Sequence, residues 1–446
     1  MDDYSSRIQL TIDTDVLELD IAPYLAPTVG RGSFPTVDEI QAELLRLAKS
    51  PDCRIRQIGN SPQGEPLRMM SVGHGPVDVL VIAGVHPNEP IGCHTVFALM
   101  RLVKDTPALS SAFTFHFIAC LDADAALMNH WYAKPLTIES YHRRFYRPPL
   151  GWQPEPTFPI DGHFERPRPE TWALMRLRDE LDPQVVLPLH NNDIGGAFFV
   201  VNRRLPDGLA DVLRSRVALT TASLNTANAE VYAWDTDGDG VFVVPGVESV
   251  IGHAAARPVA RGARVHHYFD RATVIEPEVP LWQAAARVRP PGGYPDGLQH
   301  IATERAAATE FLAECLSGVD ADLSVQTVFK AAALDTLAFA RRSVSQLTQY
   351  DGPMTADLYA GQLSILHMGR LRTAGMLLRA FEAELAAGNV RPTIRTTAAR
   401  VEQRFQLWVA ECERALRPEP FPIEQSIEIQ MQTVLVAAAQ ATGAVR

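Results

Sequence analysis

The apolar run VDVLVIA at residues 77–83 constrains the fold more than any other feature of this chain. A run of this length and composition is typical of a strand that is buried on both faces. Helical periodicity follows at 91–103, a second such strand at 113–121, a helix at 169–181, and further strands at 185–189 and 272–275. Strands that alternate with helices in this way predict an α/β fold with a mixed, mostly parallel sheet and helices on both faces.

The distribution of proline and glycine divides the chain. Only five of its 33 prolines lie after position 300, and the densest cluster of proline and glycine, RPPGGYPDG at 289–297, is typical of a linker or turn. Beyond this cluster the sequence has the pattern of amphipathic helices, expected at 302–316, 321–349, 354–387, 394–417 and 424–442. We therefore predict an α/β domain over residues 1–298 and an all-α helical C-terminal domain over residues 299–446.

The composition excludes several classes of protein. With 46% hydrophobic and 21% charged residues among 446, the chain can form a large core and is too apolar for disorder. A net charge of -11 argues against a basic face for nucleic acid or an anionic membrane. The five cysteines are scattered, as is typical of reduced thiols. With no signal-peptide pattern and no apolar run of about 18 residues, we expect a cytoplasmic protein without nucleic-acid or membrane partners.

The loop directly after the first buried strand, GVHPNEP at 84–90, carries His86 and Glu89. An imidazole and a carboxylate three residues apart on a loop can turn toward one metal ion, and both are good zinc ligands. The same spacing is common in solvated loop pairs, so the spacing alone leaves both interpretations open.

A third group of the same kind follows another predicted strand. His190, in the segment LPLHNN, lies 101 residues after Glu89. Catalytic zinc sites combine two near ligands, a distant third ligand and a water, a description that His86, Glu89 and His190 meet. The predicted strand at 272–275 runs into Glu276 and Glu278. A glutamate there is either a general base beside the zinc or part of a surface acidic pair.

Five segments, in order, resemble the zinc carboxypeptidase family (carboxypeptidase A-like), and within it the bacterial branch near the succinylglutamate desuccinylase/aspartoacylase group. They span about residues 37–282 and read TVDEIQAELLRLA, IRQIGNSPQGEPLRMMSVG, AGVHPNEPIG, PETWALMRLRDELDPQVVLPLHN and EPEVPLW. The resemblance implies that residues 1–298 form a catalytic domain with one Zn²⁺ per chain, held by His86, Glu89 and His190. The EVPLW context implies that Glu278, rather than Glu276, is the general base.

The sequence departs from the family pattern where relatives carry an Asn/Asp-Pro-Asp-Gly segment followed by an arginine. Residues 122–129 read DADAALMN here, with Leu127 at the arginine position. The next cationic cluster, YHRRFYR at 141–147, offers Arg143, Arg144 and Arg147. Guanidinium groups bind a carboxylate as a two-point fork. We predict Arg143 and Arg144 at the scissile carbonyl and Arg147 at the substrate, against the alternative of a solvated basic patch.

On the substrate side the resemblance implies Asn191, next to the third ligand, and a tyrosine for which Tyr268 and Tyr232 are candidates. His266 and His267 are expected in a strand, where neighbouring side chains point to opposite faces and so cannot bind one ion.

Two cysteines flank the proposed site in the sequence, Cys93 and Cys120. Neither has a basic partner at motif spacing, so we expect both to be buried as small hydrophobic residues.

These observations predict a zinc-dependent hydrolase that cleaves an amide bond, in the first place a metallocarboxypeptidase that removes a C-terminal residue from a peptide or peptide-like substrate. An N-acyl amino acid amidohydrolase is the alternative within the same chemistry. A degenerate, non-catalytic hydrolase that acts as a binding or scaffold protein is the alternative from another class. The helical C-terminal domain is expected to cover the site, hold a partner, or form a homodimer.

Overall fold

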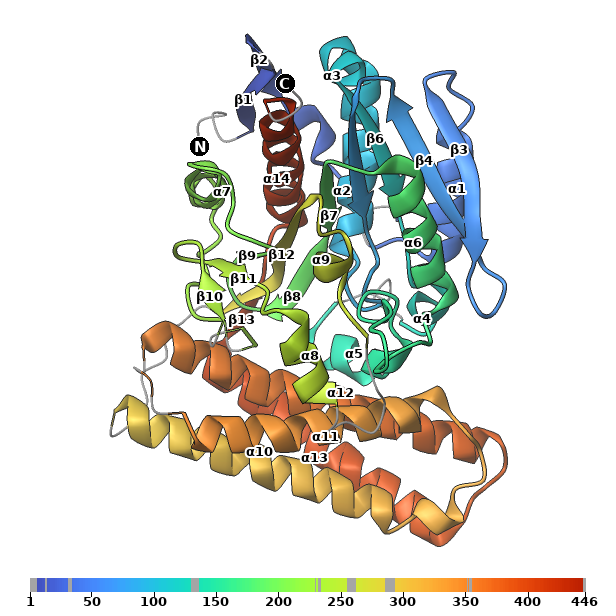
Figure 1. Ribbon diagram of the computed structural model, residues 1–446. Coiled ribbons are helices and arrows are strands. Elements are labelled where there is room, and N and C mark those ends of the chain that lie inside the picture. The colour runs from blue at the N-terminus through green and yellow to red at the C-terminus, as the bar shows by residue number, and fades with distance from the viewer. Residues whose placement is uncertain are drawn as a thin grey trace.

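Figure 1 shows a computed structural model of the chain, which describes residues 6–12, 14–30, 34–129, 136–228, 230–231, 234–254, 262–284, 293–350, 352 and 355–443. A twisted sheet carries helices on both faces, and a bundle of long helices lies across one end of it (Figure 1). The last helix runs back along the sheet. In these ranges no helix is long and apolar enough to cross a membrane.

The strands of the large sheet are β3 (Cys53–Asn60), β4 (Pro66–Gly73), β5 (Val77–Ile82), β6 (Phe113–Ile118), β7 (Val185–Pro188), β8 (His190–Ile194), β9 (Phe198–Val201), β10 (Asp235–Thr236), β11 (Val241–Val243), β12 (Thr273–Ala284) and β13 (Pro418–Pro420). Their order is β10-β11-β9-β12-β7-β5-β6-β4-β3, with β8 and β13 also paired to β12. The pairs β6–β5, β5–β7, β7–β12 and β12–β8 are parallel, and antiparallel pairs lie toward both edges. The predicted mixed, mostly parallel sheet is confirmed. A separate ribbon is formed by β1 (Arg7–Ile12) and β2 (Asp15–Asp20).

The helices are α1 (Val37–Leu47), α2 (Ile91–Asp105), α3 (Pro107–Ala112), α4 (Ala123–Ala126), α5 (Ile138–Arg143), α6 (Pro169–Leu181), α7 (Leu209–Ala218), α8 (Val247–Ala254), α9 (Val265–Tyr268), α10 (Tyr294–Ser317), α11 (Val328–Thr348), α12 (Ala356–Ala386), α13 (Pro392–Leu416) and α14 (Ile423–Thr442). Short 3-10 turns lie at Ala22–Tyr24, Leu150–Trp152 and Asp320–Asp322. The predicted strands and helices occur in the predicted order, but some bounds differ. The strand expected at 272–275 continues to Ala284, and the helix expected at 321–349 begins at Val328, after the turn at Asp320–Asp322. The strand expected at His266 and His267 is a short helix, as described below.

Strand β5 shows why its sequence lacks polar alternation. Val79 and Val81 point into the larger core, which contains α2 and α14, whereas Leu80 and Ile82 point into a second core under α6. All four side chains are fully buried. A strand covered by helices on both faces needs apolar residues at every position, which is the reason that this run predicted the fold.

The helical region does not form one separate unit. Helices α10 to α13 pack against one another, but α14 packs against α2, α7 and β12 of the sheet layer. Helix α10 begins at Tyr294, inside the segment predicted as a linker, since proline is tolerated in the first turn of a helix. Residues 285–292 lie outside the described ranges. The division of the chain at residue 298 stays a prediction.

Helix α12 lies unusually close to the α/β layer at Gly375. A Cβ atom at this position would lie 2.0 Å from the backbone oxygen of His142 in α5. Backbone atoms cannot give way as a flexible side chain does, so only glycine allows this approach. This contact sets the distance between α12 and α5.

We predict that Gly375→Ala lowers the free energy of unfolding by about 1–3 kcal/mol, the usual cost of forcing an extra group into a packed region. Gly369→Ala is the matched control, because Gly369 lies in the same helix as Gly375. Apart from the nearby backbone of that helix, no atom lies within 4 Å of a Cβ placed at Gly369. The control is expected to be neutral or to stabilise by up to about 1 kcal/mol, because alanine is the better helix former. The free energies of unfolding of both variants are to be measured in denaturant. Equal values for Gly375→Ala and Gly369→Ala would contradict the close contact at Gly375.

Candidate metal centre

The site is built where two parallel strands end side by side. In the register of β5 and β7, Ile82 lies opposite Pro188. The chain leaves β5 through Gly84, whose φ of +61° favours glycine and whose Cβ would lie 2.9 Å from the Cα of Cys120. This turn brings the loop with His86 and Glu89 over the start of β8. The carboxyl edge of the sheet thus brings together residues about 100 positions apart in the sequence.

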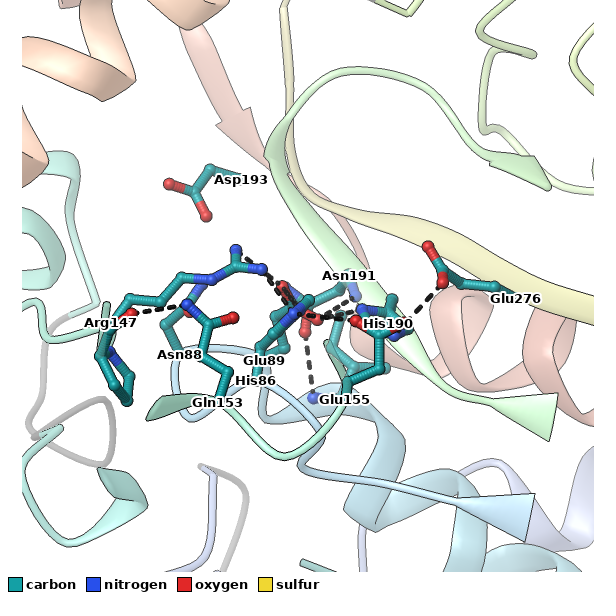
Figure 2. A network of polar contacts seen from close by, with 12 residues as sticks. His86, Asn88, Glu89, Arg147, Gln153, Glu155, His190, Asn191, Asp193 and Glu276 are labelled. Carbon is teal, nitrogen blue, oxygen red and sulfur yellow. Dashed lines mark hydrogen bonds and ion pairs between the residues drawn. The ribbon is translucent and has the colours of Figure 1, made fainter. Parts of the chain in front are cut away.

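The three predicted ligands meet around one carboxylate. Glu89 Oε1 lies 2.9 Å from His86 Nδ1, and Glu89 Oε2 lies 2.8 Å from His190 Nδ1 (Figure 2). The two imidazole rings stand edge to face with centroids 4.5 Å apart. All three side chains are buried, and one atom from each could bind the same ion. The residues that the sequence predicted as a zinc site therefore form a compact group of nitrogen and oxygen donors.

Helix α14 supports the third ligand from behind. Gln430 donates from Nε2 to the backbone oxygen of His190 at 2.8 Å, and its Oε1 accepts from Thr95 Oγ1 of α2 at 2.6 Å. The backbone N–H of Asn191 donates to Glu89 Oε2 at 3.4 Å. Groups that hold the backbone of a ligand also fix the direction of its side chain.

Strand β12 places two glutamates beside this triad. Glu278 lies directly opposite His190 in the parallel register of β12 and β8. Because alternate residues of a strand share a face, Glu276 and Glu278 point the same way. Glu276 is buried and its Oε2 lies 3.6 Å from His190 Nε2, whereas Glu278 is less buried; both line the cavity described below. This difference favours Glu278 as the carboxylate that meets a substrate.

Two further residues extend the cluster: Glu155, which was not a candidate from the sequence, and His266, which was considered there but not assigned to the site. Glu155 Oε2 lies 3.6 Å from His86 Nε2, and Glu155 Oε1 lies 3.9 Å from His266 Nδ1. His266 Nε2 in turn lies 3.7 Å from Glu276 Oε2. The prediction of a strand at His266 and His267 is wrong, because both lie in the short helix α9. The structure places only His266 in the cluster, whereas His267 contacts the backbone oxygen of Pro245.

The electrostatics of the cluster are dominated by buried carboxylates. Burial raises the pKa of Glu276 to about 7 and, together with the charge of Glu89, raises the pKa of Glu278 well above its usual range. Burial alone would lower the pKa of His190, but the carboxylates of Glu276 and Glu89 outweigh burial and raise it to about 10. An excess of negative charge in a buried site is the condition that favours a bound cation.

The donor set passes a further test for zinc. Nε2 of His190 and one oxygen each of Glu276 and Glu278 are buried and have no hydrogen-bond partner within the described part of the chain. Buried polar atoms are normally satisfied, so orphaned atoms of this kind call for an ion or water. Two imidazoles and a carboxylate are a ligand set that zinc uses in catalytic sites.

The three arginines predicted at the site lie in different surroundings. Arg147 reaches the triad, with Nη2 2.6 Å from His86 Nε2 and Nη1 3.5 Å from Glu89 Oε1. Arg143 instead forms ion pairs with Glu382 and Glu402 of the bundle. Arg144 lines a separate surface hollow with Arg143. Of the cationic cluster, only Arg147 lines the cavity of the site.

Residues 122–129, where the sequence departs from the pattern that it resembles, have a structural role. Leu127 is exposed, at the end of α4, and does not line the cavity. Asp124 accepts hydrogen bonds from Ser61 Oγ and from the backbone N–H of Gln63, and Asn129 binds the backbone of Tyr146. These contacts tie together the loops around the site.

Of the residues predicted to contact the substrate, some line the cavity and others do not. Asn191 lines the cavity, and its Oδ1 accepts from the backbone N–H of Ile91. Tyr268 stacks on Phe158 with the guanidinium of Arg178 over its ring, and does not line the cavity. Tyr232 lies outside the described residues.

The cysteines near the site are buried, as predicted. Cys93 and Cys120 lie in the larger core, and burial raises the pKa of Cys120 to about 12 and that of Cys93 further. Neither thiol ionises near neutral pH, so neither is a nucleophile.

The bundle contributes a buried charge to the site that sequence reasoning missed. Asp193, on β8 after His190, is fully buried, and its Oδ2 accepts from Arg372 of α12 at 2.8 and 3.1 Å. Tyr141 donates to Asp193 Oδ1 at 2.8 Å, and His142 Nε2 lies 3.3 Å from Oδ2. Burial alone would raise the pKa of Asp193, but Arg372, His142 and Tyr141 together outweigh burial and lower that pKa to about 2. An arginine within the helix predicted at 354–387 was the one available signal in the sequence.

A cavity of about 690 Å³ opens above His86 and Glu89 of the triad. Its floor includes His86, Glu89 and Glu278, and its roof is formed by α12, which contributes small residues and Arg372; the roof residues are Ala356, Asp357, Ala360, Gly361, Ser364, Ile365, Met368 and Arg372. This volume is within the range of small-molecule and peptide pockets. The helical region thus covers the site, one of the roles expected for it.

Comparisons with known proteins give a distant likeness. No family model matches the chain, and no curated protein matches it. Bovine thrombin-activatable fibrinolysis inhibitor, solved in complex with tick carboxypeptidase inhibitor, is 14% identical over 57% of this chain and 87% of its own, with a TM-score of 0.37. Carboxypeptidase A from Helicoverpa armigera is 13% identical over 70% and 72%, with a TM-score of 0.37.

A metallo-carboxypeptidase from Burkholderia cenocepacia is 15% identical over 61% of this chain and 67% of its own, with a TM-score of 0.33. At identities and TM-scores this low, the likeness assigns no function to this chain. The chemistry of its own buried triad, and not the comparison, decides what the site can do.

We predict that Asp193→Asn lowers the free energy of unfolding by about 3 kcal/mol at neutral pH, because it leaves Arg372 without its carboxylate. The folded pKa of Asp193 is about 2, below the unfolded value of about 3.9. The stabilisation is therefore complete above about pH 4 and is lost as the pH falls toward 2. The measurement is the free energy of unfolding of the original protein and of Asp193→Asn at several pH values. The difference between these two free energies should become smaller below about pH 4.

Glu310→Gln is the control for that measurement, because Glu310 forms an exposed pair with Arg341 at 3.4 Å. Exposed pairs contribute little, so no measurable change in stability is expected. If the difference in unfolding free energy between Asp193→Asn and the original chain stays the same down to pH 2, the ion pair of Asp193 and Arg372 is not its cause.

Proposed function

We propose that this protein is a zinc-dependent hydrolase that cleaves an amide bond, in the first place a metallocarboxypeptidase acting on a short peptide or peptide-like substrate. The observation that carries the proposal is the buried triad of His86, Glu89 and His190 around one carboxylate. His86 and Glu89 lie on the floor of a cavity that Glu278 also lines. A chain that only binds a partner has no need for this cluster of charged and orphaned donors.

The triad would hold the zinc ion through the two Nδ1 atoms and the Glu89 carboxylate. Zinc in such a site supplies Lewis-acid chemistry, which makes a water more acidic and polarises a carbonyl group. Glu278 is the residue to accept the proton from the attacking water and to deliver it to the leaving amine. Both glutamates line the cavity, but Glu278 is the more exposed of the two and lies opposite His190, whereas Glu276 lies between two histidines.

Cationic groups around the cavity support a substrate with a carboxylate. Arg147, Arg264 and Arg372 all line it. Arg147 is beside the ligands and is suited to the oxyanion or the scissile carbonyl, whereas Arg372 comes from the roof. A guanidinium in a partly buried pocket binds a carboxylate as a two-point fork. A C-terminal carboxylate and the carboxylate of an N-acyl amino acid would both satisfy this requirement.

The second candidate, an N-acyl amino acid amidohydrolase, is favoured by the roof. Helix α12 closes over the cavity and limits the space to about 690 Å³, which suits a small amide better than the end of a folded chain. Both candidates use the same zinc chemistry and differ only in the group on the acyl side.

A homodimer through the helical region stays a prediction. Because α14 packs against α2 and β12, removal of all residues after 298 would strip a layer from the sheet. Light scattering of the full-length chain is therefore the suitable measurement.

We predict about one zinc ion per chain at the triad, lost in His86→Ala and retained in Glu278→Gln, because only the first substitution removes a ligand. Glu278→Gln should lower kcat by about 10²- to 10⁴-fold, the usual contribution of a general acid–base residue. Elemental analysis and turnover of a peptide substrate measure the two effects. A parent protein that binds no zinc even after incubation with it would overturn the proposal.

We predict that the original protein cleaves peptides with a free C-terminus and that C-terminal amidation abolishes turnover, because amidation removes the carboxylate that the guanidinium groups would bind. Arg147→Gln should lower kcat/KM by at least about tenfold, as expected for the loss of a charged hydrogen bond. Arg56→Gln is the matched control, because Arg56 pairs with Glu180 on the surface. Equal cleavage of free and amidated peptides would exclude the carboxypeptidase, and turnover of N-acyl amino acids would then select the second candidate.

A further inference from the structure

The loop and the strand that carry the metal ligands lie far apart in the sequence and need a connection that does not use the ligands themselves. Glu89 contacts both histidines, but the same carboxylate oxygens would have to bind the zinc ion. One independent connection is the hydrogen bond from the backbone N–H of Ile91 to Oδ1 of Asn191, at 3.3 Å. A second connection is formed by the hydroxyl group of Tyr141.

Tyr141 belongs to α5, a helix that carries none of the three ligands. Its Oη atom accepts a hydrogen bond from Nδ2 of Asn88 at 3.2 Å and donates one to Oδ1 of Asp193 at 2.8 Å. Asn88 directly precedes Glu89 on the ligand loop (Figure 2). Asp193 lies on β8, three residues after His190. One hydroxyl group therefore joins the loop of the first two ligands to the strand of the third.

The hydroxyl group of Tyr141 can serve both partners at once. A phenol carries one proton and can also accept hydrogen bonds at its oxygen. The backbone oxygen of Asn88, at 3.0 Å, is a second possible acceptor for the proton. The carboxylate of Asp193 is closer and charged, and charged acceptors form the stronger hydrogen bonds. Burial and the charge of Asp193 raise the pKa of Tyr141 well above its usual range, so the hydroxyl group keeps its proton.

The connection lies away from solvent. Tyr141 is 5% exposed, and Asn88 and Asp193 are completely buried. Breaking a hydrogen bond between buried groups leaves a polar atom without a partner, which costs more than the loss of an exposed bond. The aromatic ring is held separately, edge to face against Trp282 of β12 at 5.3 Å and against Phe145 at 6.0 Å between centroids. Removal of the hydroxyl group alone should therefore leave the ring in place.

The same bonds connect the ligand loop to the helical region. The other carboxylate oxygen of Asp193 accepts from Arg372 of α12 at 2.8 and 3.1 Å. Arg372, Asp193, Tyr141 and Asn88 thus follow one another in an unbroken chain of hydrogen bonds. The chain begins on the roof of the cavity and ends beside the triad.

We propose that Tyr141 is a positioning residue of the metal centre, whose hydroxyl group sets the distance between the loop with His86 and Glu89 and the strand with His190. The inference rests on the proposed function in that the triad binds the ion. Groups outside the ligands that fix ligand positions change metal affinity by about 10- to 100-fold. Tyr141 is not among the described residues that line the cavity, so its role is in the position of the ligands and not in contact with the substrate.

The test is the zinc dissociation constant of the full-length protein, measured by competition with a chelator. Tyr141→Phe removes only the hydroxyl group and is expected to weaken zinc binding by about 10- to 100-fold. Tyr146→Phe is the matched control. Tyr146 is buried in the same segment and packs on Phe329, and its hydroxyl group has no hydrogen-bond partner among the described residues. The control should bind zinc like the original chain.

A double variant tests the route through the ligand loop. Asn88→Ala breaks the same hydrogen bond from the other side, so its effect on zinc binding and that of Tyr141→Phe should not add. The variant with both substitutions should bind zinc no more than about twofold more weakly than the weaker of the two single variants. Independent, additive effects would overturn the route through Asn88.

Amide hydrogen exchange of the metal-free protein measures the position of the loop directly. The backbone N–H of Glu89 donates to His86, and that of Ile91 donates to Asn191. Both should exchange faster in Tyr141→Phe than in the original chain and at an unchanged rate in Tyr146→Phe. Weaker zinc binding with unchanged exchange would overturn the positioning role.

The outcomes separate this inference from the proposed function. Zinc bound equally well by the original chain and by Tyr141→Phe would overturn the role of Tyr141 and leave the hydrolase standing. Equal weakening in Tyr141→Phe and Tyr146→Phe would do the same, because it would indicate a general loss of packing. An original chain that binds no zinc would overturn both.

Discussion

The structure depends on one carboxylate, that of Glu89, held between two imidazoles at the edge where β5 and β7 end. Its two oxygens lie 2.9 and 2.8 Å from His86 and His190, so the loop after β5 and the first residue of β8 are fixed against each other. The arrangement is possible because parallel strands bring their carboxyl ends to one edge of the sheet. Buried charges of this density need a partner, and the donor set fits a metal ion.

The helical region completes this site instead of standing apart from it. Helix α14 lies along the sheet (Figure 1). Its Gln430 donates a hydrogen bond to the backbone oxygen of His190. Helix α12 is fixed on α5 by the close approach at Gly375 and brings Arg372 to Asp193. The roof, the third ligand and the buried ion pair therefore depend on the last third of the chain. A substrate is confined to the space left between α12 and the sheet edge.

The sequence could predict the residues whose local context repeats a known physical pattern. The apolar run of β5 required helices on both faces, and a histidine or glutamate directly after a buried strand pointed to the carboxyl edge. It could not predict Glu155, which follows no strand and lies in a proline-rich loop. His266 was misplaced in a strand, because four residues that form one helical turn carry too little periodicity to distinguish the two. The choice among Arg143, Arg144 and Arg147 also depended on which neighbours the bundle supplies.

The sequence by itself determined the class of sheet, the helical nature of the C-terminal part, and the three donors of the candidate zinc site, because each follows from local periodicity and from residue chemistry at strand ends. Only the tertiary structure decided which charged residues meet. Arg147 contacts the triad while Arg143 pairs with Glu382, and Arg372 reaches Asp193 across the fold. The physical reason is that long-range pairing is set by packing distances between separate elements, which no local pattern in the chain records.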